Sequence, residues 1–251
     1  MSDEYILRTE GLTKQFHGFT AVDNVDLKIR AGSIHALIGP NGAGKTTCFS
    51  VLTKFLEPTA GRIFFKGAEI THMRPAAVSR RGVVRSFQIS AVFPGLTTRE
   101  NVRIGLQRRR GASFDFWRSK KVLNALDAAA DELLHRVGLA AFSDTLAGEL
   151  SYGRKRALEI ATMLALDPEV ILLDEPMAGM AHEDIDQIAA VIKQASAGRT
   201  VLMVEHNLGV VANLSDMITV LARGRVLAEG TYPELIANSD VRRAYLGADH
   251  E

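Results

Sequence analysis

Residues 34–52 read IHALIGPNGAGKTTCFSVL, and this stretch decides the fold. An apolar run typical of a buried strand leads into a glycine-rich loop, and apolar residues then recur at helical spacing at Cys48, Val51, Leu52 and Phe55. Residues 39–46 match the G-x-x-x-x-G-K-[ST] pattern at every fixed position. In such a loop the glycines let successive backbone N–H groups converge on phosphate oxygens, and the helix adds the positive end of its dipole. The stretch therefore predicts a strand, a phosphate-binding loop and a helix.

Strands and helices alternate along most of the chain. Three or more strands are predicted before residue 40, and the helix after the loop ends at EPTAG. Further strands are predicted in RIFFKG, VVRSFQ, EVILLDEP and TVLMVEH, with helices over 182–195 and 208–214. MITVLARGRVLAEG is predicted to form a hairpin that turns at Arg223 and Gly224. This alternation predicts a parallel sheet covered on both faces. The stretch from 97 to 166 lacks strand signals, so we expect it to be a mostly helical insertion in one α/β domain.

The composition limits the functions that the chain can have. With 251 residues and 47% hydrophobic content it can bury a large core, and 30 Lys and Arg against 29 Asp and Glu give a net charge of +1. That balance provides no overall field for nucleic acid. Cys48 is the only cysteine, which excludes an internal disulfide and a cysteine-cluster metal site and favours a reducing compartment. No apolar run approaches the ~18 residues that span a bilayer, so we expect a soluble chain that reaches membranes through a partner.

Two further strands end in residues suited to nucleotide chemistry. VILLDE ends in Asp174, which would hold Mg²⁺ through water, and Glu175, which would polarise an attacking water as general base. Beside a phosphate-binding loop, two adjacent acids fit ATP hydrolysis better than phosphoryl transfer to a small substrate. MVEH ends in His206, whose imidazole would hydrogen-bond the γ-phosphate and the water. The alternatives are solvated acids at a strand end and a structural histidine.

The stretch LSYGRKR at 150–156 opens a helix with a serine, a glycine and three consecutive cations. Ser151 and Gly153 would offer a hydroxyl, free N–H groups and a close backbone approach at the helix N-terminus. This arrangement suits an anion. The alternative is an ordinary N-cap.

Five of these motifs together resemble a known family. GPNGAGKTT, SFQ, LSYGR, ILLDEP and VEH follow the order and approximate spacing of the Walker A, Q-loop, signature, Walker B and H-loop motifs of ABC-transporter ATPase subunits, over nearly the whole chain. The resemblance implies a P-loop NTPase fold with a mainly parallel core sheet, an N-terminal antiparallel β subdomain and an inserted helical subdomain. It implies one ABC ATPase domain over 1–251, with the first two parts at about 1–88 and 167–251 and the helical subdomain at about 89–166.

The resemblance also implies ATP and Mg²⁺ as cofactors and a head-to-tail dimer. In that family the signature helix of one subunit faces the P-loop of a second, so the anion at the LSYGR helix would be the γ-phosphate of the partner's ATP. The implied catalytic residues are Glu175, His206 and Gln88, and the implied metal-binding residues are Thr46, Gln88 and Asp174. The implied nucleotide contacts are Phe16, Gly39, Pro40, Asn41, Gly42, Ala43, Gly44, Lys45, Thr46, Thr47, Ser151, Tyr152 and Gly153.

Individual roles follow from the same resemblance. Lys45 would reach the β- and γ-phosphates, and Gln88 would sense both Mg²⁺ and the membrane partner. Phe16, in KQFHGFTAV, would stack on adenine; the alternative is an aromatic that only packs on its hairpin. Residues 89–101 begin the helical insertion, and Ile89, Val92, Phe93 and Leu96 either line a groove for a coupling helix of a membrane subunit or belong to the core.

The chain departs from the family pattern at three positions. Tyr152 replaces the first glycine of the usual LSGGQ, and Arg154 replaces its glutamine. In the D-loop after Walker B, Ala181 stands where many members have Asp, which bears on how two ATP sites communicate. The segments MAGM and VRRAYLG look most like the ATP-binding subunits of branched-chain amino acid uptake systems and their urea or amide relatives.

The motifs lead to one principal function and three rivals. We expect a cytoplasmic ATPase subunit, peripheral on the inner face of the membrane, that pairs with a second copy or a paralogue. It would dock on membrane permease subunits, serve a solute-binding protein indirectly and drive solute uptake, with no nucleic acid as partner. The rivals are the ATPase of a lipopolysaccharide-type exporter, a soluble ABC ATPase and an unrelated P-loop kinase.

Two other clusters are interpreted as structural. Seven basic residues with Phe114, Phe116 and Trp117 lie between 103 and 121, and we interpret them as a solvated loop, the alternative being contact with nucleic acid or anionic lipid. His182 with the two acids after it is interpreted as the first turn of a helix, where acids favour the dipole, because no third ligand stands at a zinc-like spacing.

Overall fold

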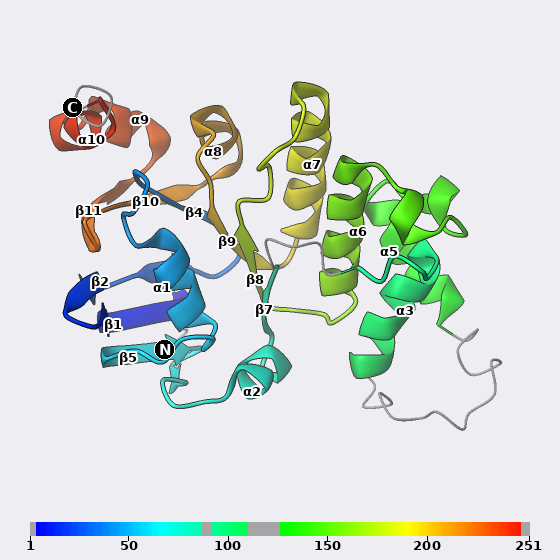
Figure 1. The fold of residues 1–251 in the computed structure, drawn as a ribbon, viewed down its shortest axis with the longest axis horizontal. Helices are drawn as coiled ribbons and strands as arrows, with labels where there is room; N and C mark the ends of the chain where they lie inside the picture. Colours follow the sequence, from blue (N-terminus) through cyan, green and yellow to red (C-terminus); the bar gives the residue numbers. More distant parts are fainter. Residues whose placement is uncertain (1–3, 87–91, 110–125, 247–251) are drawn as a thin grey trace. The chain divides into compact units, whose positions relative to one another are not determined.

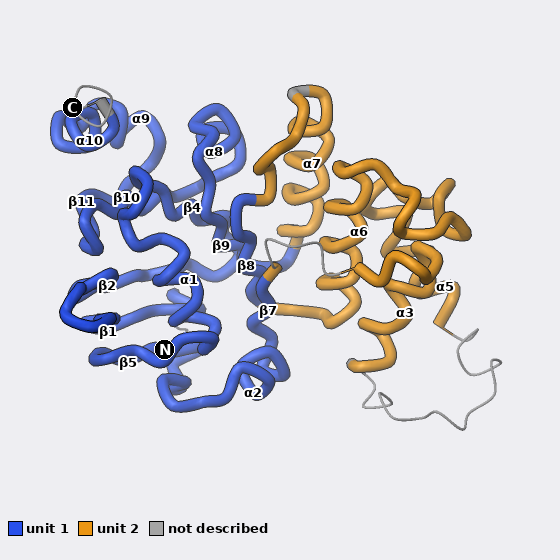
Figure 2. The backbone as a smooth tube through the Cα atoms, in the orientation of Figure 1, with its two compact units in different colours: residues 1–85, 170–175, 198–251 blue, residues 86–169, 176–197 orange. Residues whose placement is uncertain are grey.

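The computed structural model describes residues 4–86, 92–109 and 126–246, which form two compact units (Figures 1 and 2). Unit 1 comprises residues 1–85, 170–175 and 198–251, and unit 2 comprises residues 86–169 and 176–197. The sequence division placed 176–197 with the core, whereas here this segment packs with the helical unit. Each unit is described below by itself.

An antiparallel sheet begins unit 1 (Figure 1). Its order is β2-β1-β5-β6, with β3 paired to β1. The strands are β1 (Tyr5–Phe16), β2 (Phe19–Val25), β3 (Lys28–Arg30), β5 (Ala60–Phe65) and β6 (Ala68–Glu69). His17 and Gly18 turn the β1–β2 hairpin with φ of 42° and 90°, the positive values that a tight two-residue turn requires. The strand-rich N-terminal part predicted from the sequence is confirmed.

A six-stranded sheet in the order β11-β10-β4-β9-β8-β7 forms the other layer of unit 1. Its strands are β4 (Ile34–Ile38), β7 (Val83–Arg85), β8 (Val170–Asp174), β9 (Thr200–Val204), β10 (Met217–Ala222) and β11 (Arg225–Gly230). All neighbours pair in parallel except β11, which returns antiparallel to β10 through the predicted turn at Arg223 and Gly224. Strands β4, β8 and β9 are buried at every position, which explains their unbroken apolar runs.

Helix α1 (Lys45–Leu52) contacts strands of both sheets, so the two sheets share one core. The fully buried Phe49 and Leu52 of this helix pack with Leu7 from the antiparallel sheet and Leu37 from the parallel one. The other helices of unit 1 are α2 (Pro75–Arg80), α8 (Leu208–Leu214), α9 (Tyr232–Ala237) and α10 (Ser239–Leu246). The loop-to-helix element therefore joins the two layers of its unit.

One polar side chain, His35, is buried inside strand β4. Its Nε2 lies 2.8 Å from Thr219 Oγ1, and that hydroxyl donates to Glu229 Oε2 at 3.0 Å. Burial lowers the pKa of His35 to about 4, because a charged imidazole would lose its hydration there. His35 is therefore neutral at physiological pH.

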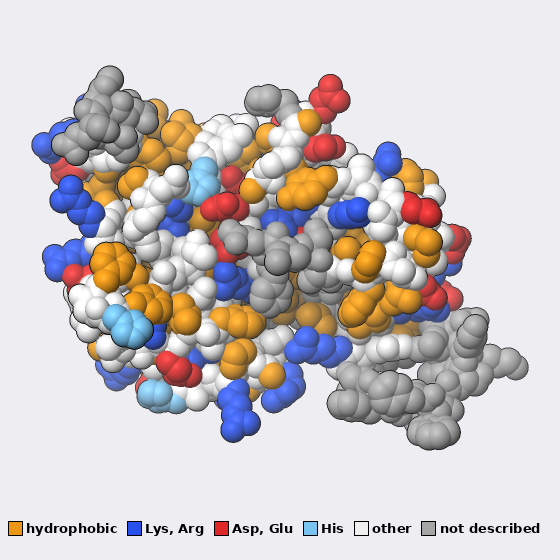
Figure 3. Space-filling model, in the orientation of Figure 1, with side chains coloured by type: hydrophobic (Ala, Val, Ile, Leu, Met, Phe, Trp, Pro, Cys, Tyr) orange, Lys and Arg blue, Asp and Glu red, His pale blue; other side chains and the backbone are white. Residues whose placement is uncertain are grey.

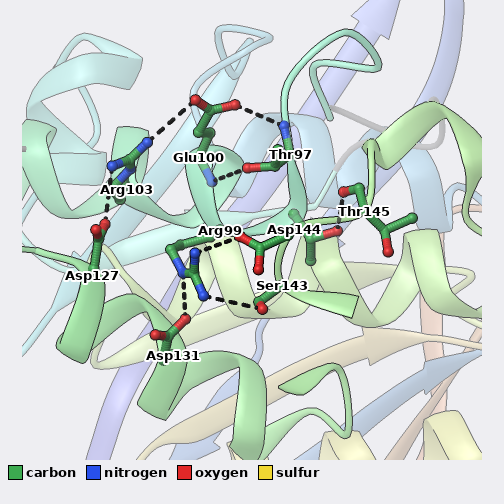
Figure 4. A network of polar contacts seen from close by, with 10 residues as sticks. Thr97, Arg99, Glu100, Arg103, Asp127, Asp131, Ser143, Asp144 and Thr145 are labelled. Carbon is green, nitrogen blue, oxygen red and sulfur yellow. Dashed lines mark hydrogen bonds and ion pairs between the residues drawn. The ribbon is translucent and has the colours of Figure 1, made fainter. Parts of the chain in front are cut away.

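Unit 2 is helical over its described ranges, as the sequence predicted for 97–166. Its elements are α3 (Thr98–Arg109), α5 (Asp127–Arg136), the 3₁₀ turns η1 (Ala140–Phe142) and η2 (Ala147–Glu149), α6 (Tyr152–Leu164) and α7 (His182–Ala195). Figure 4 shows how charged residues tie these elements together: Arg99 contacts Asp131 at 2.7 Å and Asp144 at 2.6 Å. One turn further along α3, Arg103 contacts Asp127 at 3.0 Å. These pairs fix α3 to α5 and to the turn before α6.

Surface charges of both signs are mixed on the face drawn in Figure 3. Basic and acidic side chains alternate there with apolar ones, in keeping with the net charge of +1. This face therefore offers local charge patterns rather than a field of one sign.

Candidate nucleotide-binding and catalytic site

The glycine-rich loop between β4 and α1 has a backbone that only glycine can supply at two positions. A Cβ added to Gly39 would lie 2.2 Å from the Leu221 carbonyl oxygen, and one added to Gly44 would lie 2.2 Å from the Ala21 carbonyl oxygen. Gly44 also has φ 97°, in the left-handed region. The loop thus packs closely against the backbone at Leu221 and Ala21, and these contacts fix its shape.

Lys45 is buried at the start of α1, and its Nζ donates to the carbonyl oxygens of Gly39 at 2.7 Å and Pro40 at 3.0 Å. Burial lowers the pKa of Lys45, while the negative charges of Glu175 and Asp174 oppose that shift. The two acids predicted from the sequence therefore lie close enough to act on the lysine. Thr46 and Asn41 are exposed beside it, and Thr47 is half-buried.

The C-terminal helix α10 also reaches this loop. Burial raises the pKa of Tyr245 to about 12, and a hydrogen bond with the backbone of Gly39 works in the opposite direction. A turn on the other side supports the loop as well, since Gly224 N–H donates to the Ala43 carbonyl at 3.1 Å. The loop is therefore supported by the final helix and by the β10–β11 hairpin.

Asp174 and Glu175 follow one another at the carboxyl end of β8 but have different surroundings. Asp174 is only 1% exposed, and its Oδ2 lies 2.6 Å from Nη2 of Arg85. Glu175 has φ 47°, an uncommon value for a residue other than glycine, and its N–H donates to the Val204 carbonyl at 3.0 Å. Its Oε1 lies 2.7 Å from Nε2 of His206. The structure thus brings together the predicted general base and the predicted histidine.

Arg85 is a site residue that the sequence analysis missed. A cation at the end of the short apolar strand β7 gives only a weak signal in the sequence, because strand ends usually carry solvated charges. Its partner Asp174 lies 89 residues further along the chain. The parallel pairing of β7 with β8 brings the two together.

The signature segment opens α6 in unit 2. Ser151 is its N-cap, and the hydroxyl accepts from the Arg154 N–H at 3.5 Å. Tyr152 is exposed, and its hydroxyl donates to the Ala178 carbonyl at 3.0 Å in the D-loop segment. Gly153 is buried against α7, where an added Cβ would lie 3.0 Å from the carboxyl of Asp184. Tyr152 stands where the family pattern has a glycine, and its hydroxyl links the start of α6 to the D-loop segment of the same unit.

The remaining predicted residues are placed as follows. Phe16 ends β1, is 38% exposed and has the Lys14 ammonium 5.1 Å from its ring centroid.

Phe93 is 53% exposed, and buried Asn101 fixes its backbone by accepting from its N–H at 2.7 Å and donating to its carbonyl at 3.1 Å. Val92 and Leu96 are half-buried, so these three side chains are not core residues. Gln88, Ile89, Phe114, Phe116 and Trp117 lie outside the described residues.

The donor set suits a hard divalent cation held together with a ligand. Thr46 and Asp174 offer oxygen atoms, the type that Mg²⁺ prefers, and Mg²⁺ is usually bound by one or two protein groups together with substrate phosphates. Within the described ranges no group of three or more His, Cys, Asp or Glu side chains could hold a metal by itself. The residues present therefore fit a metal that arrives with a nucleotide.

These features define the class of protein. The P-loop follows β4, His206 follows β9, and the two acids stand at the end of β8 and directly after it, so all three groups lie at the carboxyl ends of adjacent parallel strands. Ligands of open α/β sheets bind at that edge. The fold and this edge are those of a P-loop nucleotide-binding protein.

Comparison with known proteins identifies the family. A model of the ABC transporter family matches residues 22–178, and a model described as branched-chain amino acid ATP-binding cassette transporter matches residues 225–251. The chain is 39% identical to the high-affinity branched-chain amino acid transport ATP-binding protein BraF of Pseudomonas aeruginosa, with 96% of this chain and 98% of that protein covered. Its identity to LivG of Escherichia coli, named in the same way, is 36%, with the same coverage of both chains.

Solved structures agree with the sequence relatives. The crystal structure of the ADP conformation of MJ1267, an ATP-binding cassette of an ABC transporter, superposes with a TM-score of 0.83 at 30% identity, covering 97% of this chain and 99% of that one. The dimeric structure of MJ0796, a bacterial ABC transporter cassette, gives a TM-score of 0.75 at 25% identity, covering 90% and 98%.

The chain belongs to the ABC transporter family and is an ATP-binding subunit of this class of transport ATPases. The family and the enzyme class predicted from the five motifs are thereby confirmed. No helix in the described part of the chain is both long and apolar enough to cross a membrane.

Proposed function

We propose that this subunit hydrolyses MgATP in a head-to-tail dimer and thereby drives uptake of branched-chain amino acids or related small polar solutes through membrane permease subunits. The observation that carries the catalytic part is the 2.7 Å contact between Glu175 and His206. The P-loop is near this contact, because the charges of Glu175 and Asp174 act on the pKa of its Lys45. A base, a cation and a phosphate cradle at one sheet edge are the parts that ATP hydrolysis requires.

Each residue at the edge has a role in this proposal. The backbone N–H groups of the loop surround the phosphates, and Lys45 exchanges its loop carbonyls for the β- and γ-phosphate oxygens. Thr46, Asp174 and Gln88 would hold Mg²⁺, which would neutralise charge on the phosphates. Glu175 polarises the attacking water, and His206 orients the carboxylate through the hydrogen bond that it already makes.

Adenine stacking is assigned to Phe16. Its ring stands at the end of a β-hairpin, and 38% of the residue is exposed, so part of it is accessible to a planar base. The Lys14 ammonium near the ring adds a positive charge that could interact with the nucleotide's phosphates or with the edge of the base.

The dimer is proposed because the signature segment offers donors at a surface. Ser151, exposed Tyr152 and Gly153 stand at the N-terminus of the 13-residue helix α6, where backbone N–H groups and the helix dipole favour an anion. In the proposed dimer this anion is the γ-phosphate of ATP held by the P-loop of a second copy or a paralogue. The dimeric cassette MJ0796 supports such pairing within the family.

Permease docking is assigned to the start of the helical insertion. Phe93 is exposed on a backbone that Asn101 holds with hydrogen bonds at both its N–H and its carbonyl, which keeps an apolar side chain presented to solvent. Val92 and Leu96 flank it and are half-buried. A peripheral position on the inner face of the membrane follows from this docking, as does indirect service to a solute-binding protein.

The cargo is proposed from the relatives. BraF and LivG are named as branched-chain amino acid transport proteins, and the C-terminal family model carries the same description. Reconstitution with the cognate permeases and binding protein in liposomes tests the cargo: ATP inside the vesicles should drive uptake of labelled leucine, and export of a lipid or no movement of any amino acid would contradict it.

Glu175→Gln tests the mechanism without the permease. The variant keeps the size and hydrogen-bonding reach of the side chain but loses the base, so ATP should bridge two subunits and persist. Size-exclusion chromatography with ATP and Mg²⁺ should show a dimer for the variant and a monomer when EDTA is added. A variant that binds ATP and stays monomeric, both alone and with its permease, would contradict the sandwich.

A further inference from the structure

Arg85 is the last residue of β7 and lies largely inside unit 1. Its Nη2 contacts Oδ2 of Asp174 at 2.6 Å, with 11% of the arginine side chain and 1% of the aspartate side chain exposed. The guanidinium cannot lose its proton in a protein, so this charge is permanent. A fixed positive charge therefore touches the carboxylate that the proposed function assigns to Mg²⁺.

The other arm of the same guanidinium reaches helix α1. Nη1 donates to Ser50 Oγ at 3.1 Å and lies 3.4 Å from Thr53 Oγ1. Ser50 Oγ in turn donates to the backbone carbonyl of Thr46 at 2.8 Å. Arg85 thus bridges the helix that carries Thr46 and the strand that carries Asp174, the two described residues assigned to the metal.

The centre of the guanidinium lies 5.9 Å from the Phe49 ring centroid, and Nε is buried without a hydrogen-bond partner among the described residues. Phe49 is itself fully buried. The contact with the ring is favourable, but keeping a charged group this buried with one donor unsatisfied costs stability. The cation is therefore better explained by what it does to its neighbours than by packing.

We propose that Arg85 sets how strongly nucleotide binding depends on Mg²⁺, because its charge competes with the metal for the Asp174 carboxylate. This inference rests on the proposed function. A cation at this position weakens the attraction of the site for a divalent cation and strengthens its attraction for the nucleotide's phosphates. Arg85 is thus a positioning residue that makes nucleotide binding less dependent on the metal.

The bridge to Ser50 has the opposite effect, since it holds Asp174 in one orientation and so favours the metal. Freeing the rotamers of one short side chain changes an affinity by roughly threefold. A unit charge beside a buried carboxylate changes the affinity for a divalent cation by about tenfold or more. The effect of the charge therefore outweighs the effect of the bridge. Removing the charge should make nucleotide binding depend more strongly on Mg²⁺.

The test uses isothermal titration calorimetry with the non-hydrolysable analogue AMP-PNP. The measured quantity is the dissociation constant in EDTA divided by the dissociation constant in excess Mg²⁺. Arg85→Gln and Arg85→Met should each raise this ratio about tenfold over the wild type, because binding weakens in EDTA and tightens with Mg²⁺. Gln keeps hydrogen-bonding groups for Ser50 and Asp174, and Met keeps the volume against Phe49. Circular dichroism establishes that each variant is folded.

Two further variants separate charge from structure. Arg85→Lys keeps the charge without the two-armed bridge, so its ratio should match the wild type within about threefold. Lys54 is another buried cation of unit 1, paired with Glu57 at 3.1 Å, and Lys54→Met should lower stability and leave the ratio unchanged.

An unchanged ratio in folded Arg85→Gln or Arg85→Met would overturn the proposal, and so would a lower one. If neither neutral variant folds, Arg85→Lys decides: a ratio about tenfold below the wild type would show that the bridge dominates and would also overturn it, whereas a retained ratio would support the charge. A wild-type protein that binds no AMP-PNP in either condition would contradict the proposed function instead, so the two failures are distinguishable.

Discussion

The nucleotide edge of unit 1 and the signature segment of unit 2 are built in opposite ways. At the edge the charges are held by the chain itself: Lys45 donates to its own loop, Asp174 pairs with Arg85, and Glu175 contacts His206. At the signature segment, Ser151 and Tyr152 lie at the surface, and the cap hydrogen bond of Ser151 is long, at 3.5 Å.

This difference suggests separate roles for the nucleotide edge and the signature segment. Groups that are paired within the chain have their geometry fixed before any ligand arrives, which suits catalysis. Groups at an exposed helix start keep donors available for another molecule. In the proposed dimer, one chain thus contributes an organised catalytic half and an open half that a second chain completes.

The largest effect is expected at the organised half. Glu175→Gln should lower ATP hydrolysis by about 10²–10⁴-fold, because the general base is lost while the phosphate cradle is kept. Phosphate release at saturating ATP measures it. The matched control is Glu132→Gln, an exposed glutamate of α5 paired with Arg136, which should hydrolyse ATP at the wild-type rate. Hydrolysis that survives in Glu175→Gln would assign the base elsewhere.

The next effect belongs to the open half. Ser151→Asp keeps a good N-cap residue but places a negative charge where the partner's phosphate is proposed to bind, so hydrolysis should fall about 100-fold. Binding of AMP-PNP to the variant's own P-loop should change by less than about threefold, because that loop lies on the other half of the site. Thr231→Asp, at the capped start of α9, is the control and should leave both quantities unchanged.

A pH effect on stability is expected from His35 in unit 1. Folded His35 has a pKa of about 4 against 6.5 when unfolded, so the unfolded chain binds more protons between these values and stability is lost as the pH falls. The free energy of unfolding should drop by about 1.4 kcal/mol from this group between pH 7.5 and 5.5. Urea denaturation of the wild type and of His35→Gln measures it, and equal pH slopes for the two proteins would contradict the assignment.

The smallest effect is expected at Tyr152. Tyr152→Phe removes only the exposed hydrogen bond to the Ala178 carbonyl, which should lower the free energy of unfolding by about 0.5–1 kcal/mol. Hydrolysis should fall by less than about threefold, since Ser151 and Gly153 keep the start of the helix. Urea denaturation and phosphate release measure the two effects. A loss as large as that of Ser151→Asp would mean that the link to the D-loop segment, rather than the helix start, organises the open half.

Much of the edge could be predicted from the sequence because its signals are local. Short sequence patterns of a few residues define the P-loop glycines, the apolar strands and the two acids of Walker B. Because the carboxyl ends of parallel strands meet at one edge of the sheet, Glu175 and His206 then come together. The hairpin at Arg223 and Gly224 was predictable for the same reason.

The partners of Arg85, Tyr152 and His35 could not be predicted. Asp174 lies 89 residues from Arg85, Ala178 lies 26 residues from Tyr152, and Thr219 lies 184 residues from His35. Which polar groups meet across such separations depends on strand order and side-chain packing, and neither is carried by periodicity or by a short motif. A histidine inside the apolar run IHALI gives no sign of being neutral until its burial is known.

Mixing two inactive variants tests the division of labour most directly. Lys45→Ala lacks the P-loop cation but has an intact signature segment, and Ser151→Asp has the reverse. In a mixed dimer the P-loop of Ser151→Asp faces the intact signature of Lys45→Ala, which restores one complete site. The mixture, assembled with the permease where required, should hydrolyse ATP well above the sum of the two variants measured apart. A mixture no more active than that sum, under conditions in which the wild type is active, would contradict it.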